Sequence, residues 1–259
     1  MAMPVLATKL FVPPPRVNAV ARDRLVRTLQ DGLASGRKLT LISAPAGFGK
    51  TTLVSEWLAE AERADPATRV AWVSLDENDN DPTRFFTYVL AALSRAEPAL
   101  GMTEFDPQVP LEETLAALIN QLTSGEHRII LVLDDFHLIE DAAIRDAIAF
   151  LIDHLPPQLR LTLASRSDPL LPLARLRTRD ELTELRATDL RFTPEEAASF
   201  LNRAMGLSLS PEDVAALETR TEGWIAGLQL AALSMRDQTD IPGFIADFAG
   251  SNRFVVDYL

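Results

Sequence analysis

The sequence predicts an α/β fold with a mostly parallel five-stranded sheet, followed by a small all-α helical domain. Two observations predict the sheet: short, nearly continuous apolar runs recur along the chain, and segments of helical periodicity separate them. Strands that alternate with helices are typical of parallel sheets. A third observation predicts the helical domain, because strand-like runs stop after about Leu190. We therefore expect one domain over residues 1–190 and a second over 191–259.

The first domain is expected to begin with an N-terminal extension and a helix over residues 1–36. Three consecutive prolines, Pro13 to Pro15, forbid a helix around them, so residues 1–16 are expected to be extended and 17–33 to be helical. Strands are predicted over 39–44, 70–75, 129–133 and 161–164, with a weaker fifth over 182–186. The helices between them are predicted over 51–63, 83–95, 111–122 and 141–155.

The second domain contains three predicted helices. Thr193–Glu196 and Ser210–Asp213 each place a capping hydroxyl before a proline at the first helical position, with acidic residues behind it. A third apolar segment of helical length runs from about Trp224 to Met235. We therefore expect this part of the chain to be entirely helical.

Composition excludes several classes of function. The 259 residues carry a net charge of −12, which argues against a free-standing nucleic-acid-binding domain. No cysteine is present, which excludes disulfides and thiolate metal sites, and three histidines make a dedicated metal cage unexpected. No segment reaches the roughly 18 apolar residues of a membrane span, and the N-terminus lacks a signal-peptide core. We expect a cytoplasmic protein without a membrane partner.

A loop between the first predicted strand and the next helix gives the sharpest functional prediction. Ala44–Thr52 reads Ala-Pro-Ala-Gly-Phe-Gly-Lys-Thr-Thr, a Walker A sequence with alanine at its first glycine. Glycines let backbone N–H groups curl around phosphates, Lys50 can reach the β and γ phosphates, and the Thr51 hydroxyl can ligate Mg²⁺. The alternative, a turn with a surface lysine, is disfavoured by the flanking strand and helix. The expected nucleotide-binding residues of this loop are Ala46, Gly47, Phe48, Gly49, Lys50, Thr51 and Thr52.

A second apolar run, 129–133, ends in two carboxylates, Asp134 and Asp135. Buried parallel strands deliver such residues to the ligand crevice at their carboxyl ends. Asp134 is the expected partner of Mg²⁺, through water, and Asp135 is expected to polarise the attacking water. Aspartates that cap helices also follow strands, but together with the phosphate loop the run favours the Walker B strand of a P-loop NTPase.

Basic side chains beyond two of the strands are further candidates. Arg166 follows the fourth apolar run and is predicted to contact the γ-phosphate, because we expect that strand beside the P-loop strand. His137 lies just beyond Asp135, where a structural histidine is favoured over a γ-phosphate sensor. The arginines at 175, 177 and 179 are expected to be solvated or at an interface.

The stretch Ser74–Pro82 is acidic and allows three interpretations. Its carboxylates can form a merely solvated loop, or a Ca²⁺ site, although no central glycine provides the turn of an EF-hand. We favour a loop at the rim of the crevice, with Asp76 or Glu77 near the catalytic water.

Five stretches together resemble the N-terminal half of MalT-like regulators, the ATP-dependent LuxR-type transcription activators within the STAND class of signal-transduction ATPases. The similarity spans nearly the whole chain. The Ser-Leu-Asp-Glu stretch and the Glu-Gly-Trp stretch are more specific than a P-loop alone. The stretches are Val20–Leu25, Ala44–Thr52, Ser74–Pro82, Asp134–Ile139 and Thr221–Leu230.

The resemblance implies a nucleotide-binding domain, a helical domain and, in longer relatives, a winged helix, a sensor domain and a helix-turn-helix. Val256–Leu259 looks like the entrance to the winged helix, so we expect a fragment of a longer protein. In this family ADP holds a closed state, whereas ATP and an inducer favour opening and self-association. The resemblance also implies that Val20 and Arg22 pack on adenine. Gln229 stands where the wider class has a proline that contacts the nucleotide.

Three functions compete at this point. The first is an ATP/ADP-binding switch with slow Mg²⁺-dependent hydrolysis, which the helical domain and the Glu-Gly-Trp stretch favour. The second is a P-loop phosphotransferase acting on a small molecule, which would need a lid with convergent arginines. The third, a motor or clamp ATPase on nucleic acid, is disfavoured by the net charge of −12. We expect no direct nucleic acid binding by this chain.

Overall fold

The structure is a computed structural model that describes residues 4–15, 18–101, 105–236 and 240–248. Five parallel strands form one sheet in the order β2-β3-β4-β1-β5. This confirms the predicted α/β class with a five-stranded sheet. The strands are β1 (Leu39–Ser43), β2 (Thr68–Ser74), β3 (Arg128–Asp134), β4 (Leu159–Ser165) and β5 (Leu182–Arg186).

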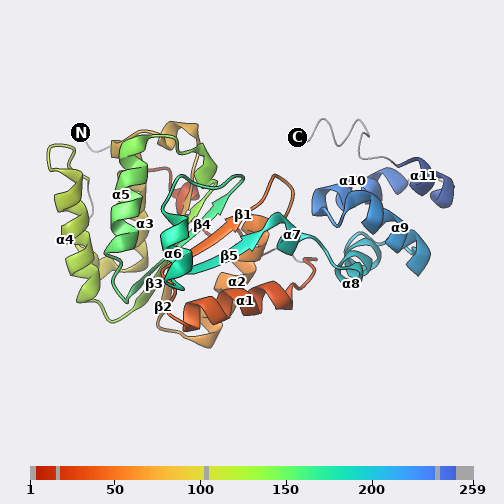
Figure 1. Ribbon diagram of the computed structural model, residues 1–259, viewed down its shortest axis with the longest axis horizontal. Coiled ribbons are helices and arrows are strands. Elements are labelled where there is room, and N and C mark those ends of the chain that lie inside the picture. The colour runs from red at the N-terminus through yellow and green to blue at the C-terminus, as the bar shows by residue number, and fades with distance from the viewer. Residues whose placement is uncertain (1–3, 16–17, 102–104, 237–239, 249–259) are drawn as a thin grey trace.

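Helices cover both faces of the sheet (Figure 1). Neighbouring strand residues divide between the two layers: Leu41 and Leu131 pack with one set of helices, whereas Ile42 and Val132 pack with the other. This burial on both faces explains why the strands are nearly continuous apolar runs. The first layer contains α3 (Pro82–Ala96), α4 (Leu111–Thr123) and α5 (Ala142–Asp153), and the second contains α1 (Asp23–Ala34) and α2 (Lys50–Ala64).

Beyond the sheet the chain forms a separate group of helices with its own core, which we call the helical lobe (residues 191–248). Phe192, Leu201, Leu217 and Leu228 belong to this core. The elements of the lobe are α8 (Pro194–Ala198), a π-helix η5 (Ser199–Ala204), α9 (Pro211–Thr221), α10 (Ile225–Met235) and α11 (Ile241–Asp247). Figure 1 shows the lobe at one end of the molecule, joined to the sheet through α7 (Ala187–Leu190). A domain boundary at residue 190 stays a prediction, and Val256–Leu259 lie outside the described residues.

The predicted caps start two helices of this lobe. Thr193 Oγ1 accepts a hydrogen bond from the Glu196 N–H at 3.2 Å, and Glu196 Oε2 accepts one from the Thr193 N–H at 3.0 Å. Ser210 Oγ accepts from the Asp213 N–H at 3.1 Å. Side-chain oxygens thus satisfy backbone donors that the first helical turn leaves free.

The N-terminal extension departs from the prediction. Residues 7–10 form a short 3-10 helix, η1 (Ala7–Leu10), instead of an extended segment, and α1 begins at Asp23 rather than near residue 17. The three prolines follow η1 and therefore do not prevent it. Other short elements are η2 (Glu77–Asp79), η3 (Pro98–Leu100), η4 (Phe136–Leu138) and α6 (Leu173–Thr178).

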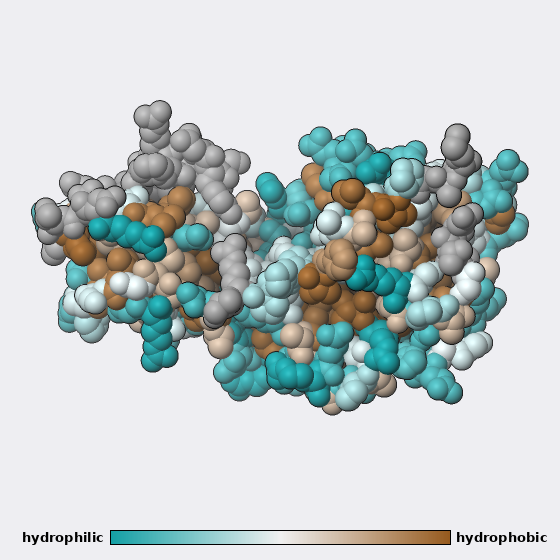
Figure 2. Space-filling model, turned by 180° about the vertical axis from the view of Figure 1, so that it is seen from behind, coloured by the Kyte–Doolittle hydropathy of each residue, from teal (hydrophilic) through white to brown (hydrophobic). Residues whose placement is uncertain are grey.

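Viewed from behind, the surface is hollowed between the sheet and the helical lobe (Figure 2). Among the described residues, no helix combines the length and the apolar character that crossing a membrane requires.

Candidate functional site

The loop Ala44–Gly49 joins β1 to α2, in the strand–loop–helix context that the sequence predicts. Gly47 and Gly49 have φ angles of 78° and 74°, in the left-handed region that favours glycine. A Cβ atom on Gly47 would lie 2.5 Å from the Cβ of Ala226, so a larger residue would also collide with the helical lobe. The backbone therefore curls tightly just before the N-terminus of α2, an arrangement suited to an anion.

Lys50 begins α2 and folds back over this loop. Its Nζ donates hydrogen bonds to the carbonyl oxygens of Ala44 at 2.7 Å and Pro45 at 3.0 Å, and the residue is 8% exposed. Burial lowers the pKa of Lys50, although the nearby charge of Asp135 acts in the opposite direction. Among the described residues Lys50 makes no ion pair with a carboxylate, so its buried ammonium suits a polyanionic ligand.

The two carboxylates at the end of β3 lie in different environments. Asp134 is 4% exposed and accepts a hydrogen bond from Thr51 Oγ1 at 2.9 Å. Burial, and then the charge of Asp135, raise the pKa of Asp134 to about 6. Asp135 has a φ of 59°, a left-handed conformation that costs energy for a residue other than glycine. The Thr51 hydroxyl and the Asp134 carboxylate are oxygen donors of the kind that Mg²⁺ prefers, so the donor set fits the predicted metal.

A polar cavity of about 270 Å³, which we call the phosphate cavity after its predicted ligand, brings most of the predicted site residues together. It is lined by Ala46, Gly47, Gly49, Lys50, Thr51, Thr52, Asp135 and Arg166, together with Ile225, Ala226 and Gln229 from α10. Phe48 does not line this cavity but packs against the core of the α1 and α2 layer. Asp134 lies behind Thr51, through the hydrogen bond described above.

Arg166 follows β4, which lies between β1 and β3, so the expectation that its strand neighbours the P-loop strand is confirmed. Its side chain is exposed and, within the described part of the chain, makes no ion pair. His137 is also near: its Nδ1 lies 3.8 Å from Asp135 Oδ1 and has no hydrogen-bond partner among the described residues. Burial lowers the pKa of His137, and the positive charges of Arg166 and Lys50 act in the same direction.

A second cavity, of about 170 Å³, adjoins the first and shares Gly49, Thr52, Ile225 and Gln229 with it. We call it the base cavity after its predicted ligand. Val20 and Arg22, which the family resemblance assigns to adenine, both line this second cavity. The two cavities thus follow one another along the P-loop, as the base and the phosphates of a nucleotide would. The roles of these residues stay predictions.

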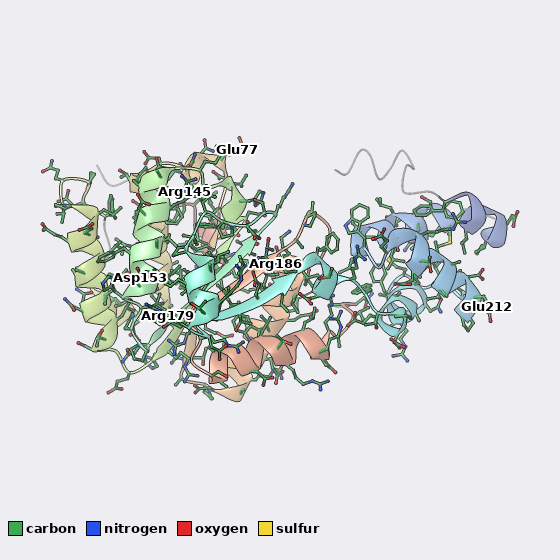
Figure 3. All side chains as sticks on the ribbon, in the orientation of Figure 1. Glu77, Arg145, Asp153, Arg179, Arg186 and Glu212 are labelled. Carbon is green, nitrogen blue, oxygen red and sulfur yellow. The ribbon has the colours of Figure 1, made fainter. Side chains whose placement is uncertain are left out.

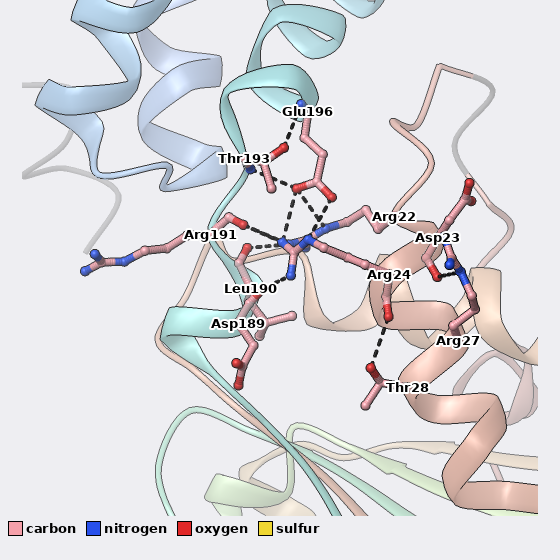
Figure 4. Close-up of polar contacts among 10 residues, drawn as sticks. All are labelled: Arg22, Asp23, Arg24, Arg27, Thr28, Asp189, Leu190, Arg191, Thr193 and Glu196. Atoms are coloured by element: carbon pink, nitrogen blue, oxygen red, sulfur yellow. Dashed lines mark hydrogen bonds and ion pairs between the residues drawn. The ribbon is translucent and has the colours of Figure 1, made fainter.

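Arg22 and Arg24 also hold the connection between the sheet and the helical lobe (Figure 4). Arg22 Nη2 donates to the Leu190 carbonyl oxygen at 2.6 Å, and Arg24 Nη2 donates to that of Arg191 at 2.8 Å. Arg24 Nε also donates to Glu196 Oε1 at 3.2 Å. Burial lowers the pKa of Arg22 to about 10, against the opposing charge of Glu196. The base cavity and the connection between the lobes therefore share Arg22.

The helical lobe contacts the P-loop directly, which sequence reasoning missed. Trp224 Nε1 donates to the Ala46 carbonyl oxygen at 3.0 Å, and the Ala226 N–H donates to that of Gly47 at 3.1 Å. The Glu-Gly-Trp stretch that begins at Glu222 contains the contacting tryptophan, but its sequence indicates the family and not the contact with the P-loop.

The acidic stretch after β2 is only partly solvated, because Glu77 and Asp81 are exposed whereas Asp79 is fully buried. Lys9, from η1, forms ion pairs with Asp76 and with the fully buried Asp79. Arg84 Nε donates to Asp79 Oδ1 at 2.9 Å. Glu77 points outward at the rim of the molecule (Figure 3). Neither Asp76 nor Glu77 lines the phosphate cavity. We call Lys9, Asp76, Asp79 and Arg84 the N-terminal clasp.

The arginines after β4 lie at the surface, as the sequence predicts. Arg175 pairs with Asp153, and Arg177 Nη2 lies 2.7 Å from Glu184 Oε1. Arg179 is exposed and lies with Asp153 away from the helical lobe (Figure 3). None of the three lines the phosphate cavity.

Comparison with known proteins is consistent with this geometry. The AAA ATPase domain family matches residues 18–164, more than half of the 259 residues. Among solved structures, a Walker-type ATPase of Pyrococcus abyssi is similar, with a TM-score of 0.58 and 13% identity over 91% of this chain and 73% of that one. At that identity the similarity shows a shared fold only.

Two curated relatives match most of this chain. The serine/threonine-protein kinase PknK of Mycobacterium tuberculosis is 37% identical over 99% of this chain and 23% of its own length. The HTH-type transcriptional regulator MalT of Yersinia enterocolitica is 38% identical over 90% of this chain and 25% of its own length. This chain spans about a quarter of either relative. The chain belongs to the AAA ATPase domain family, and the match to MalT confirms its resemblance to the nucleotide-binding part of MalT-like regulators.

Proposed function

We propose that the chain is an ATP/ADP switch. It binds adenine nucleotide with Mg²⁺, and the nucleotide that is bound changes the contact between the P-loop and the helical lobe. The observation that carries the proposal is the pair of hydrogen bonds from Trp224 and Ala226 to the P-loop carbonyl oxygens. A nucleotide that changes the conformation of the P-loop changes these hydrogen bonds as well. Nucleotide state and lobe arrangement are therefore energetically linked, provided that the ligand binds the two arrangements with different affinity.

Each site residue has a distinct role in this proposal. Lys50 leaves its carbonyl partners to bind the β and γ phosphates, while Thr51 and Asp134 hold Mg²⁺. When bound, Mg²⁺ neutralises charge on the phosphates. Asp135 orients and polarises a water molecule, and Arg166 contacts the γ-phosphate. We expect hydrolysis well below the roughly 1–100 s⁻¹ of kinases, because a switch needs its bound state to persist.

For the whole protein we argue by analogy with one relative, MalT, which is named an HTH-type transcriptional regulator. We infer that the full-length protein regulates transcription in the cytoplasm, that it self-associates in the ATP state, and that DNA is contacted by parts outside this chain. The acidic net charge of −12 favours that division of labour.

Nucleotide content and thermal unfolding test the proposal together. We expect the purified chain to retain ADP, and added ADP or ATP with Mg²⁺ to raise the melting temperature. At a hundredfold excess over Kd the gain is about 2.7 kcal/mol, on the order of 5–10 °C for a chain of this size. The proposal fails if ADP, ATP and GTP all leave the melting curve unchanged.

Hydrolysis separates the role of Asp135 from binding. Asp135→Asn is expected to reduce ATP hydrolysis far more than ATP affinity, because the side chain acts on water rather than on the nucleotide. Equal loss of hydrolysis and affinity would instead assign Asp135 to maintaining the loop.

The alternative function, a phosphotransferase for a small molecule, needs arginines that converge on the phosphate cavity. Arg175 and Arg177 instead pair with surface carboxylates. In the described residues nothing favours this alternative over the switch.

A further inference from the structure

The base cavity has apolar walls around a small number of polar groups. Leu53, Phe192, Phe200, Met205 and Ile225 are among the apolar residues that line it. Such walls suit the two faces of a flat heteroaromatic ring, which carry no hydrogen-bonding groups. The ring's identity must therefore be read at its edge, by the polar side chains in the cavity.

Glu56 is one of these polar side chains and lacks a partner. It lies on α2, lines the cavity, and is only partly exposed. Among the described residues its carboxylate makes neither a hydrogen bond nor an ion pair. Burial raises the pKa of Glu56, and the more distant charge of Arg22 only partly offsets this. A ligand that enters the cavity and displaces water from this carboxylate must supply an N–H or O–H donor in its place.

Arg22 presents the opposite requirement in the same cavity. It is 4% exposed, and its Nε and Nη1 atoms have no hydrogen-bond partner among the described residues. A guanidinium only donates, and a carboxylate only accepts. Both nitrogens are buried, however, and Nε lies 4.0 Å from Glu196 Oε2, so the group that the cavity offers to the edge of a ring is the acceptor Glu56.

Adenine presents a donor that suits this acceptor. Its exocyclic amino group is a donor and lies beside a ring nitrogen that accepts, whereas guanine places two acceptors, N7 and O6, along the corresponding edge. Building on the function proposed above, we propose that Glu56 reads the exocyclic amino group of adenine by accepting a hydrogen bond from it. Glu56 is then a specificity-determining residue, and it selects adenine over purines that lack this donor.

Calorimetric titration with two ligands isolates this single hydrogen bond. The ligands are ADP and purine riboside 5′-diphosphate, which differ only in the exocyclic amino group. We expect the unaltered chain to bind ADP roughly 10- to 100-fold more tightly, the range for a hydrogen bond to a charged group. Glu56→Met is expected to bind the two ligands equally, with the whole loss falling on ADP. Glu56→Gln is expected to keep part of the preference, because its amide oxygen still accepts.

A matched control lies one helical turn further along α2. Glu60 pairs with Arg63 on the surface and does not line the cavity, so Glu60→Met is expected to keep the full preference for ADP. The inference is overturned if the unaltered chain binds both diphosphates equally, or if Glu56→Met keeps the preference. If Glu56→Met does not fold, the comparison between Glu56→Gln and the unaltered chain decides.

Failure of the switch proposal has a different signature. If the inference alone fails, ADP still binds, and Lys50→Ala still abolishes binding, but the amino group makes no difference. If neither diphosphate binds the unaltered chain, the proposed nucleotide site is wrong and the role of Glu56 is refuted with it.

Discussion

Two acidic clusters lie at the carboxyl ends of neighbouring strands, and they differ in how their charges are met. After β2, Asp79 is fully buried and bound by Lys9 and Arg84. After β3, Asp134 is almost as buried, but its side-chain donor is the neutral hydroxyl of Thr51. Ser74 and Asp134 are paired in register, so the two clusters share one edge of the sheet. In this chain the carboxylate whose charge is paired within the protein is a structural one, and the carboxylate left without a cationic partner at hydrogen-bond distance among the described residues belongs to the candidate ligand site.

The largest expected effect lies in the satisfied cluster. Lys9→Met leaves the buried Asp79 with Arg84 as its remaining cationic partner, so the cost should approach but not exceed the roughly 3–5 kcal/mol of breaking a buried pair completely. Denaturant unfolding measures this loss. Arg63→Met, at an exposed ion pair with Glu60, should cost less than about 1 kcal/mol. Similar losses in both variants would mean that the clasp is no more than a surface contact.

The cluster after β3 should make the free energy of unfolding depend on pH. The pKa of Asp134 lies near 6 in the folded chain against 3.8 in the reference state, so the folded state binds the proton more tightly. Stability is therefore lost as pH rises from about 4 to 6, and the difference of about two pKa units corresponds to about 3 kcal/mol. Asp134→Asn cannot ionise, so it should be more stable than the unaltered chain above pH 6, with the advantage fading towards pH 4.

Asp76 in the clasp serves as a control, because its contribution to stability should change with pH in the opposite direction. Partial burial acts to raise the pKa of Asp76, but hydrogen bonds from Lys9 and Asn78 outweigh it and lower the pKa. Its contribution is present above its unfolded pKa and is lost as pH falls through the folded value. Unfolding curves of Asp76→Asn should therefore approach those of the unaltered chain at low pH. A common pH trend for the two substitutions would contradict the comparison.

Ligand binding should depend on one cluster and not on the other. Lys50→Ala removes the cation of the phosphate cavity and should abolish the stabilisation of about 2.7 kcal/mol expected at a hundredfold excess of ADP. Lys9→Met should keep the full ligand-induced shift, measured from its own lower baseline. A shift retained by Lys50→Ala in differential scanning fluorimetry would place the nucleotide elsewhere.

The smallest predicted effect concerns the third phosphate. Arg166 faces the phosphate cavity, where its guanidinium can bind phosphate oxygens that ATP has and ADP lacks. A charge-assisted hydrogen bond is worth about 1.5–3 kcal/mol, so Arg166→Ala should weaken ATP binding roughly 10- to 100-fold and leave ADP binding nearly intact. Paired calorimetric titrations decide this, and equal weakening of both nucleotides would limit Arg166 to supporting the fold.

Local sequence could predict the P-loop, the acidic end of β3 and the order of strands and helices, because each depends on neighbouring residues. The clasp joins residues 70 positions apart, and the contact of Trp224 with Ala46 spans 178 positions. Periodicity and motif spacing carry no information on such pairs. For the same reason, the sequence of the acidic stretch after β2 predicts a candidate site, because it does not show that Lys9 pairs with Asp76 and Asp79. The position of Glu56 in the base cavity could not be predicted either, because a glutamate on an amphipathic helix is ordinarily solvated.

The position of Trp224 makes the chain its own optical probe. The chain has three tryptophans, and Trp57 and Trp72 are each 1% exposed inside the sheet core. Trp224 alone touches the P-loop, and its indole N–H donates to the loop backbone. A change in indole emission on adding nucleotide therefore reports on the junction of the lobes, without a label and on the timescale of mixing.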